Sequence, residues 1–310
     1  MSKRLQEIEG AIKKLEEFER NPVYADRLYA IKENIIFLKA ARSLPAYIKW
    51  LLTRTGKLDG SKLLELTDFP VPEWDRKMHW RLIEMQKRDN PGLVKPLVEA
   101  IVDFVKKENR DLICANLGAG GMEVDRQVIR RLIDSSYNKR LVIVAVDKSE
   151  TTREIAKENL ASLNSEIELI EVDQLTLEQL EETKQKTNKN IVVFLCKNDI
   201  FELDKTFPAK YFDLVYHSLF KHHLDDKQKR ELDRVLDDLS NTILEYDGYL
   251  NKSVIVLQTI VGWNYPNFLN AELFSNFRFK EKDFVLSYAK ERGDINFYSG
   301  LGQYLLKIKL

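Results

Sequence analysis

The residues with the clearest chemical potential are a cluster of glycines and an acid that follows it along the chain. Gly118, Gly120 and Gly121 come directly after one apolar run, and Asp147 comes directly after the next. Glycines let a backbone approach a ligand closely, and a carboxylate at this place can accept hydrogen bonds from ribose hydroxyls. The pattern therefore predicts a nucleotide-binding site.

The segments around these residues predict the elements that hold them in place. Residues 112–117 and 141–146 are short apolar runs typical of buried strands, and Val124, Val128 and Leu132 recur between them at helical spacing. A strand, a glycine turn, a helix and a second strand form half of a doubly wound α/β fold. In such a fold, ligands bind beyond the carboxyl ends of the strands.

Three histidines are candidate catalytic bases. His217 is predicted at the carboxyl end of a strand over 212–218, and His222 and His223 follow on the next loop or short helix. Imidazole titrates near neutral pH and can accept a proton from an acceptor hydroxyl. Packing or solvation is the alternative role for each histidine, and the sequence offers no third ligand at suitable spacing for a metal.

Four segments, in this order, resemble the motifs of class I S-adenosylmethionine-dependent methyltransferases. They are Asn116-Leu-Gly118-Ala-Gly120-Gly121, Asp147, Asn198-Asp199-Ile200 after the apolar run 191–196, and 212–218 with the loop to Leu224. The resemblance covers roughly residues 93–310. It implies a doubly wound, seven-stranded Rossmann-like α/β sheet with an antiparallel last strand, and S-adenosyl-L-methionine as the cofactor.

The resemblance also implies which residues hold that cofactor. Asp147 would bind the ribose, Asp199 and Ile200 would flank the adenine, and backbone N–H groups of the glycine turn would bind the carboxylate. Asp173 ends another strand-like run, 167–172, so either this run or 191–196 could be the third strand of the sheet, and either Asp173 or Asp199 could lie beside the adenine. We prefer 191–196 and Asp199, because that run leads directly into 212–218, and 166–190 is then an insertion. The full implied cofactor-binding set is Asn116, Gly118, Ala119, Gly120, Asp147, Lys148, Asn198, Asp199, Ile200 and Tyr216.

Two departures from the family pattern leave other functions open. Asn116 stands where the motif normally opens with an acid, and Gly121 follows Gly120 directly instead of one position later. These changes favour a catalytically degenerate, methyltransferase-like binding module as one alternative. An NAD(P)-dependent oxidoreductase is the other, although its G-x-G-x-x-G fingerprint fails at Glu123.

The breakers Asn90-Pro91-Gly92 predict a boundary between an all-helical domain, 1–90, and a methyltransferase domain, 91–310. Helices are predicted at about 5–15, 26–41, 44–52 and 78–85, with a proline-rich loop over 66–76. The helical domain, with aromatic segments 69–80 and 263–268, could cap the site or form a homodimer. Towards the C-terminus we expect a helix over 229–244, a strand over 253–259 and an antiparallel pair, 277–288 with 303–308.

Composition limits the acceptor and the location. Forty-nine Lys and Arg balance 49 Asp and Glu, and zero net charge argues against a nucleic-acid substrate. We therefore expect a small-molecule acceptor, methylated at oxygen or nitrogen. Cys114 and Cys196 fall in predicted buried strands, which favours a reducing, cytoplasmic compartment. No apolar run is long enough to span a membrane. The basic stretch 32–57 could contact a membrane surface peripherally, although a solvated helix face is the commoner explanation.

Overall fold

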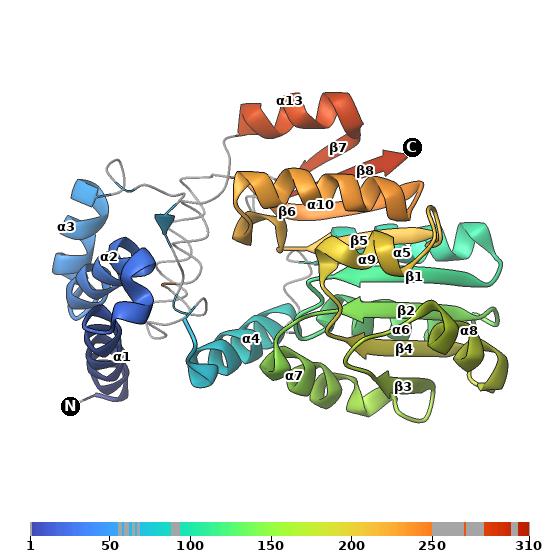
Figure 1. The fold of residues 1–310 in the computed structure, drawn as a ribbon, viewed down its shortest axis with the longest axis horizontal. Helices are drawn as coiled ribbons and strands as arrows, with labels where there is room; N and C mark the ends of the chain where they lie inside the picture. Colours follow the sequence, from blue (N-terminus) through green and yellow to red (C-terminus); the bar gives the residue numbers. More distant parts are fainter. Residues whose placement is uncertain are drawn as a thin grey trace. The chain divides into compact units, whose positions relative to one another are not determined.

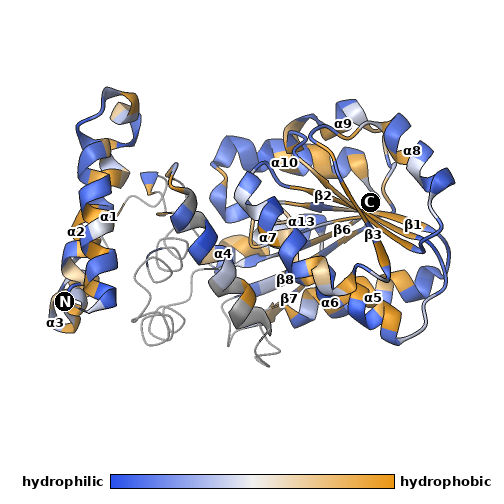
Figure 2. Cartoon of the chain, turned by 90° about the horizontal axis from the view of Figure 1, so that it is seen from below, coloured by the Kyte–Doolittle hydropathy of each residue, from blue (hydrophilic) through white to orange (hydrophobic). Residues whose placement is uncertain are grey.

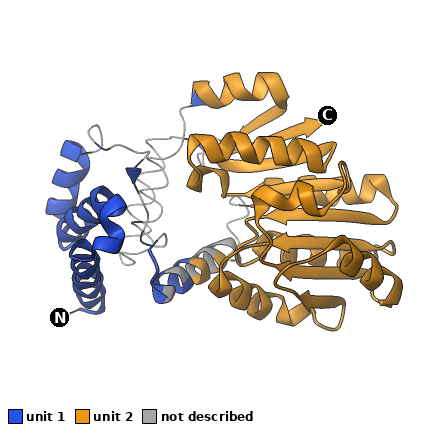
Figure 3. Ribbon diagram, in the orientation of Figure 1, with its two compact units in different colours: residues 1–78, 249–282 blue, residues 79–248, 283–310 orange. Residues whose placement is uncertain are grey.

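The computed structural model describes residues 2–54, 58, 62–63, 66, 69–87, 94–249, 270, 282–298 and 303–309. The chain divides into two compact units, each discontinuous in sequence. The first comprises Met1–Met78 and Tyr249–Lys282, and the second comprises His79–Gly248 and Asp283–Leu310 (Figure 3). The predicted boundary at Asn90-Pro91-Gly92 lies outside the described residues, so a division into 1–90 and 91–310 stays a prediction.

An eight-stranded sheet forms the centre of the described part of the second unit, in the order β3-β4-β2-β1-β5-β6-β8-β7 (Figure 1). Six strands are parallel, and β8 and β7 form an antiparallel pair that joins the edge of β6. The strands are β1 Leu112–Leu117, β2 Leu141–Val146, β3 Ile167–Glu171, β4 Ile191–Cys196, β5 Leu214–Ser218, β6 Thr242–Gly248, β7 Gly293–Tyr298 and β8 Gln303–Lys309. The predicted α/β class with an antiparallel closing strand is confirmed.

Helices cover both faces of this sheet. Figure 2 shows α5 and α6 on one face and α8, α9 and α10 on the other. The helices of the second unit are α5 Lys95–Glu108, α6 Glu123–Asp134, α7 Glu150–Leu160, α8 Leu177–Lys186, α9 Leu203–Thr206, α10 Asp226–Leu239 and α13 Lys282–Arg292. Because both faces are covered, β2 and β4 are buried along their whole length, which explains their unbroken apolar sequences.

The seven-stranded prediction missed one strand. Both candidates for the third strand, 167–172 and 191–196, form strands. β4 pairs with β2, and β3 pairs with β4 at the edge of the sheet. The segment 166–190, predicted as an insertion, therefore contributes β3 and α8 to the sheet and its cover. The preferred assignment of 191–196 as the neighbour of β2 is confirmed.

Two predictions near the C-terminus need correction, and a third is not tested. Helix α10 ends at Leu239 instead of 244, because Ser240 turns to an extended conformation and bonds to Thr242 at the start of β6. The predicted strand 253–259 lies outside the described residues. The first arm of the closing pair is β7, since 282–292 forms α13, in which Val285 and Ala289 share the buried side at helical spacing.

The described part of the first unit is helical, as predicted. It holds α1 Lys3–Glu19, α2 Leu28–Ala40 and α3 Leu44–Arg54, whose buried side chains pack together in one cluster. Helix α4, Pro72–Lys87, begins inside the predicted loop 66–76, because proline is well suited to the first turn of a helix. Among the described helices, none has the length and apolar character needed to cross a bilayer.

Candidate active site

The glycine turn joins the carboxyl end of β1 to α6 and folds back onto the end of β2. Gly118 and Gly120 have φ angles of 67° and 52°, which favour glycine. A Cβ on Gly118 would lie 2.4 Å from the Phe220 ring, so this position also needs glycine for packing. A Cβ on Gly121 would lie 2.5 Å from Ile83 of α4, so that helix lies against the turn.

The backbone donors of this turn are used within the protein. The N–H groups of Gly118 and Ala119 donate to the Val146 carbonyl at 2.9 and 3.1 Å, and Gly120 donates to Asp147 Oδ2 at 2.9 Å. These three N–H groups therefore already have acceptors in this structure, and their binding of a cofactor carboxylate stays a prediction. The glycines still allow a ligand to lie close to the backbone of the turn, although these three N–H groups already have acceptors.

Asp147 lies at the carboxyl end of β2 and faces the glycine turn. Its Oδ2 accepts from Gly120, and its Oδ1 accepts from the Ser149 backbone N–H at 2.9 Å. A carboxylate has about four lone-pair sites, so these two bonds leave capacity for a diol. The side chain is partly exposed and Lys148 beside it is exposed, so this end of β2 is open to a ligand.

Asn116 at the end of β1 belongs to a buried polar cluster with Asp125 of α6 and Tyr216 of β5. Its Nδ2 donates to Asp125 Oδ2 at 2.6 Å, and the Tyr216 hydroxyl donates to Asp125 Oδ1. All three residues are at most 3% exposed. Burial raises the pKa of Asp125 to about 6, although the two hydrogen bonds oppose the rise. Asn116 Oδ1 is buried with no hydrogen-bond partner among the described residues.

The first turn of α6 already carries two buried acids, Glu123 and Asp125. Glu123 accepts from both Arg126 Nε and Nη2, at 2.7 and 2.6 Å. Asn159 of α7 donates to Glu123 and to the Gly121 carbonyl, which ties the turn to that helix. A helix N-terminus usually attracts anions, but here Arg126 offsets the charge of Glu123 and Asp125 has no cationic partner, so the turn carries a net negative charge that disfavours a phosphate.

The predicted adenine-side residues follow β4. Both polar atoms of Asn198 bond to the Leu175 backbone, at 2.8 and 3.0 Å, so this side chain holds the connection before α8. Asp199 is exposed and accepts from Phe201 N at 3.0 Å, and Ile200 is partly exposed. Asp173 is largely exposed and forms ion pairs with Arg153 and Lys197.

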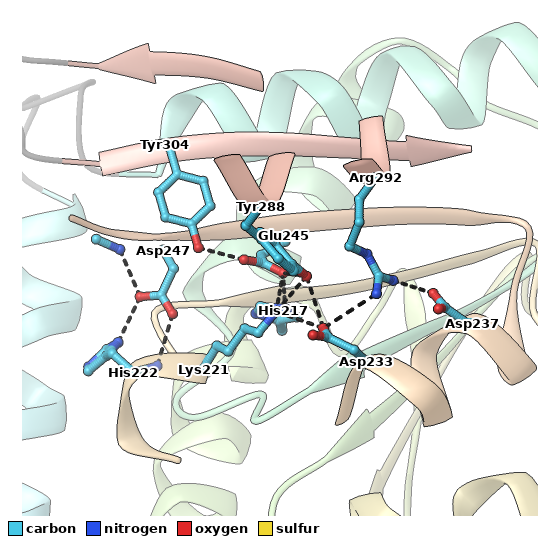
Figure 4. A network of polar contacts seen from close by, with 11 residues as sticks. His217, Lys221, His222, Asp233, Asp237, Glu245, Asp247, Tyr288, Arg292 and Tyr304 are labelled. Atoms are coloured by element: carbon cyan, nitrogen blue, oxygen red, sulfur yellow. Dashed lines mark hydrogen bonds and ion pairs between the residues drawn. The ribbon is translucent and has the colours of Figure 1, made fainter. Parts of the chain in front are cut away.

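His217 lies on the α10 side of β5, inside a buried charged cluster (Figure 4). Its Nε2 is 3.7 Å from Oε2 of Glu245, its register partner on β6, and neither ring nitrogen has a hydrogen-bond partner among the described residues. Lys221 Nζ bonds to Glu245 at 2.9 Å, to Asp233 of α10 at 2.7 Å and to Tyr288 of α13 at 2.7 Å. The cluster thus joins β6, α10 and α13 to the loop after β5.

The charges in this cluster stabilise one another. Burial alone would raise the pKa of Glu245, but the positive charge of Lys221 lowers it well below its usual range. Burial alone would lower the pKa of Lys221, but Glu245 and Asp233 raise it. The pair therefore stays ionised, and His217 lies beside it with no access to solvent.

His222 is held by Asp247, which lies two residues after Glu245 on the same face of β6. The His222 Nδ1 is 2.7 Å from Asp247 Oδ1, and its backbone N–H donates to Asp247 Oδ2 at 3.0 Å (Figure 4). A carboxylate bonded to Nδ1 fixes the ring orientation and its tautomer, as in general-base pairs. His223 is partly exposed and its ring packs against His222, with centroids 4.1 Å apart.

Several residues of this region escaped the sequence analysis. Asp125 lies in the first turn of α6, where its side chain bonds to Asn116. Glu245 and Asp247 lie on β6, a strand that the sequence analysis did not recognise, and the pairing of β5 with β6 brings them to the candidate histidines. His79 of α4 lies 3.7 Å from the place of a Cβ on Gly120. The signal that could have found Asp125 was its position in the first turn after the glycines.

No family model matches the chain, and no curated protein matches its sequence. Among solved structures, it is similar to the methyltransferase domain of bacterial-CtHen1, with 17% identity over 70% of this chain and 100% of that one, at a TM-score of 0.42. It is also similar to magnesium protoporphyrin IX methyltransferase from Synechocystis PCC 6803 with bound SAH, with 13% identity over 75% and 93% of the two chains, at a TM-score of 0.44. An O-methyltransferase family protein from Burkholderia thailandensis has 12% identity over 91% and 72%, at a TM-score of 0.44.

The strand order and the antiparallel closing pair are those of a doubly wound, mixed α/β sheet, which is the fold class expected from the sequence. At these identities, the likeness to solved structures concerns the fold alone. The chemistry of this chain has to be argued from its own residues.

Proposed function

We propose that the protein transfers a methyl group from S-adenosyl-L-methionine to a small-molecule acceptor, at oxygen or nitrogen. The observation that carries this proposal is the pairing of Asp147 with the glycine turn, beside the unpartnered Asn116 Oδ1. Asp147 has lone pairs left that a ribose diol could use, and the buried Asn116 acceptor lies at the end of β1, two residues before Gly118. The zero net charge favours a small acceptor over a nucleic acid.

The two acids in the first turn of α6 disfavour the dinucleotide alternative. A nicotinamide dinucleotide places its pyrophosphate at this helix N-terminus, where backbone N–H groups and the helix dipole stabilise it. Here Glu123 and Asp125 occupy that turn, and the N–H groups of Gly118, Ala119 and Gly120 already have acceptors. S-adenosylmethionine carries no phosphate, and its amino-acid end pairs the carboxylate with an ammonium group, so that end has no net charge for the acids of this turn to repel.

The residues of the chain would have two tasks in the reaction. Bound cofactor supplies an activated methyl group on a sulfonium, so the protein mainly has to position an acceptor, which can contribute roughly 7–11 kcal/mol. If the acceptor is a hydroxyl, a general base adds about 10²–10⁴-fold. Of the three candidate histidines, we propose His222 for this role, because Asp247 fixes its ring. His217 and His223 stay candidates for positioning the acceptor.

A ligand-dependent unfolding experiment tests the proposal. The protein is melted with S-adenosylmethionine, S-adenosylhomocysteine or NADPH, and the series is repeated on Asp147→Asn. The amide oxygen can keep the bond from Gly120 but loses the charge and the bond from Ser149, so ribose binding should weaken, and unfolding of the variant without ligand shows whether the turn still holds. We expect stabilisation by both sulfur nucleotides, about 2.7 kcal/mol at a hundred times Kd, and a much smaller effect in the variant.

Asp238→Asn is the matched control, because it makes the same chemical change at a side chain of α10 that is 51% exposed, pairs with the exposed Arg234 and belongs to no candidate site. It should respond to ligands like the unchanged protein. Stabilisation by NADPH alone would favour the oxidoreductase, and no response to any of the three would favour a degenerate binding module.

A further inference from the structure

A row of exposed aliphatic side chains runs along α3 in the first unit. Leu44, Ile48 and Leu52 are 47%, 45% and 79% exposed, and they recur at a spacing of four residues. Side chains four residues apart lie one above the other on the same face of a helix. These three are half of the six large apolar side chains exposed in the described part of the chain, so they form a stripe instead of scattered single residues.

The stripe is separate from the side by which α3 packs on α2 (Figure 1). Tyr47 and Trp50 are buried, and both rings contact Phe37 of α2, with ring centroids 6.1 and 5.2 Å apart. At 3.6 residues per turn, the centre of the stripe lies roughly 130° around the helix from these two rings. Helix α3 therefore has one apolar face for the core and a second apolar face that is exposed.

The charge around the stripe is positive. Residues 34–57 contain five Lys and Arg and no Asp or Glu. Acids of α1 and α2 pair with Lys39, Arg42 and Arg54. Lys49 of α3 is exposed and forms no ion pair within the described ranges. Its ammonium is therefore available to an anion beside the stripe.

The first unit as a whole is also basic. Its two segments, 1–78 and 249–282, hold 19 Lys and Arg against 14 Asp and Glu. Because the whole chain is neutral, the second unit is acidic by the same difference. Long-range attraction therefore brings the first unit, and not the second, to an anionic surface.

The side chains of this face select among the partners that such a surface could have. A symmetric dimer through α3 would bring the positive charges of the two copies together. A nucleic acid is held by Lys and Arg at its phosphates and gains little from Leu or Ile. Protein interfaces favour Trp, Tyr and Arg, but Tyr47 and Trp50 face the core. Aliphatic side chains flanked by lysine suit the boundary between the headgroups and acyl chains of an anionic bilayer.

We propose that α3 docks the protein on an anionic lipid surface, with Leu44, Ile48 and Leu52 inserted at the headgroup boundary and Lys49 beside the lipid phosphates. The docking is peripheral, because α3 has 11 residues and a spanning helix needs about 20. It uses residues of the first unit alone, so it does not depend on the proposed methyl transfer.

Flotation of the full chain with lipid vesicles tests this docking. Vesicles that contain phosphatidylserine and phosphatidylcholine are compared with vesicles of phosphatidylcholine alone. We expect binding to the first kind, binding roughly tenfold weaker or less to the second, and a loss of binding at high salt, which screens the attraction of charges.

Two variants separate the apolar contribution from the charged one. Ile48→Gln/Leu52→Gln removes the aliphatic side chains without changing the charge, and glutamine is a good helix former. It should weaken binding roughly tenfold or more, because these side chains no longer enter the bilayer. Lys49→Gln should weaken binding to vesicles with phosphatidylserine roughly fivefold.

Val23→Gln is the matched control. Val23 is 77% exposed, close to the value for Leu52, but it lies in η1, Pro22–Arg27, outside the stripe. This variant should bind vesicles like the unchanged protein. Circular dichroism and thermal unfolding of each variant show whether the binding data concern folded protein.

Several outcomes would overturn the proposal. Unchanged binding by the folded Ile48→Gln/Leu52→Gln variant, or an equal loss in Val23→Gln, would show that the stripe is not the contact. If the unchanged protein binds neither kind of vesicle, docking on lipid is wrong. Retention on an RNA homopolymer would then assign the basic face to nucleic acid, and a dimer that the double variant loses in sedimentation would assign the stripe to a second copy of the chain.

Discussion

The buried acids of the second unit differ in what compensates their charge. Asp125 is bonded by the neutral donors Asn116 and Tyr216, and burial raises its pKa to about 6. Glu245 lies 2.9 Å from the ammonium of Lys221, whose charge outweighs burial and lowers the pKa of the acid. The first acid is therefore poised to change its charge near neutral pH, whereas the second stays ionised.

Asp125 should make stability fall as the pH rises. Its pKa is higher in the folded protein than in the unfolded chain, so its contribution is complete below about pH 4 and is lost as the pH rises through about 6. The difference corresponds to about 3 kcal/mol. Burial raises the pKa of the facing groups Cys114 and Tyr216, which therefore stay protonated over this range. We expect Asp125→Asn to lack this loss, measured by urea unfolding at pH 4.5 and 7.5.

If the unchanged protein and Asp125→Asn lose the same unfolding free energy between pH 4.5 and 7.5, Asp125 is not the cause of that loss. Because other groups also titrate between these pH values, the informative quantity is the difference between the two proteins at each pH.

Glu245→Gln should destabilise the protein strongly. It leaves the buried Lys221 with one carboxylate partner, Asp233, and removing one member of a buried pair costs roughly 3–5 kcal/mol. Chemical unfolding measures the loss. Glu202→Gln breaks the exposed pair with Lys205 and should change stability by less than about 1 kcal/mol.

The pH dependence of this variant provides a second check. Because the pKa of Glu245 is lowered on folding, its stabilisation is present above its unfolded pKa of about 4.5 and is lost as the pH falls through the folded value. Glu245→Gln should therefore lose less stability on acidification than the unchanged protein. Equal acid sensitivity would contradict the ionised pair.

At the scale of elements, two glycines in different settings should respond to alanine with opposite sign. Gly118 has φ 67° and lies against Phe220, so Gly118→Ala should cost about 2 kcal/mol or more from backbone strain and the clash. Gly10 lies inside α1 with no atom within 4 Å of an added Cβ, so Gly10→Ala should stabilise by about 1 kcal/mol. Thermal unfolding of both variants measures this contrast. A neutral Gly118→Ala would show that the turn can relax.

How well each element could be predicted depends on how local its signal is. β1, β2 and β4 are short apolar runs between clear breakers, and their predicted bounds agree with the structure. β6 follows α10 after two residues, and its apolar positions continue an apparent helical pattern, so the boundary was misplaced. α13 was taken for a strand because its alternating residues fit both periods over a short stretch.

The candidate site shows the same limit. Asp147 and the glycine turn are close in sequence, and their contact could be predicted from the fold pattern. The pairs His222–Asp247 and Lys221–Glu245 join residues about 25 positions apart, and they depend on the register of β5 and β6. Sequence alone does not specify that register, so it identified the histidines without the acids that orient them.

At the scale of the whole molecule, the chain forms two units with separate cores. Ile8, Leu15, Ile31 and Leu38 belong to the core of the first unit, whereas the sheet and helices α5, α6 and α7 build a core in the second. Residues 249–282 join the first unit although they lie between β6 and α13 in sequence. Local patterns are read along the chain, so they predict consecutive domains and carry no signal for a unit that combines two separate segments.

This division leads to a prediction for hydrogen exchange. All candidate cofactor-binding residues lie in the second unit. S-adenosylhomocysteine should therefore slow exchange in peptides covering 112–126 and 141–150, because a ligand on the glycine turn suppresses local opening there. Peptides covering α1, α2 and α3 should exchange at unchanged rates, and Asp147→Asn should lose the protection at equal ligand concentration. Ligand-dependent protection within α1–α3 would contradict this expectation and assign the first unit a part in closing the site, as a cap over the acceptor.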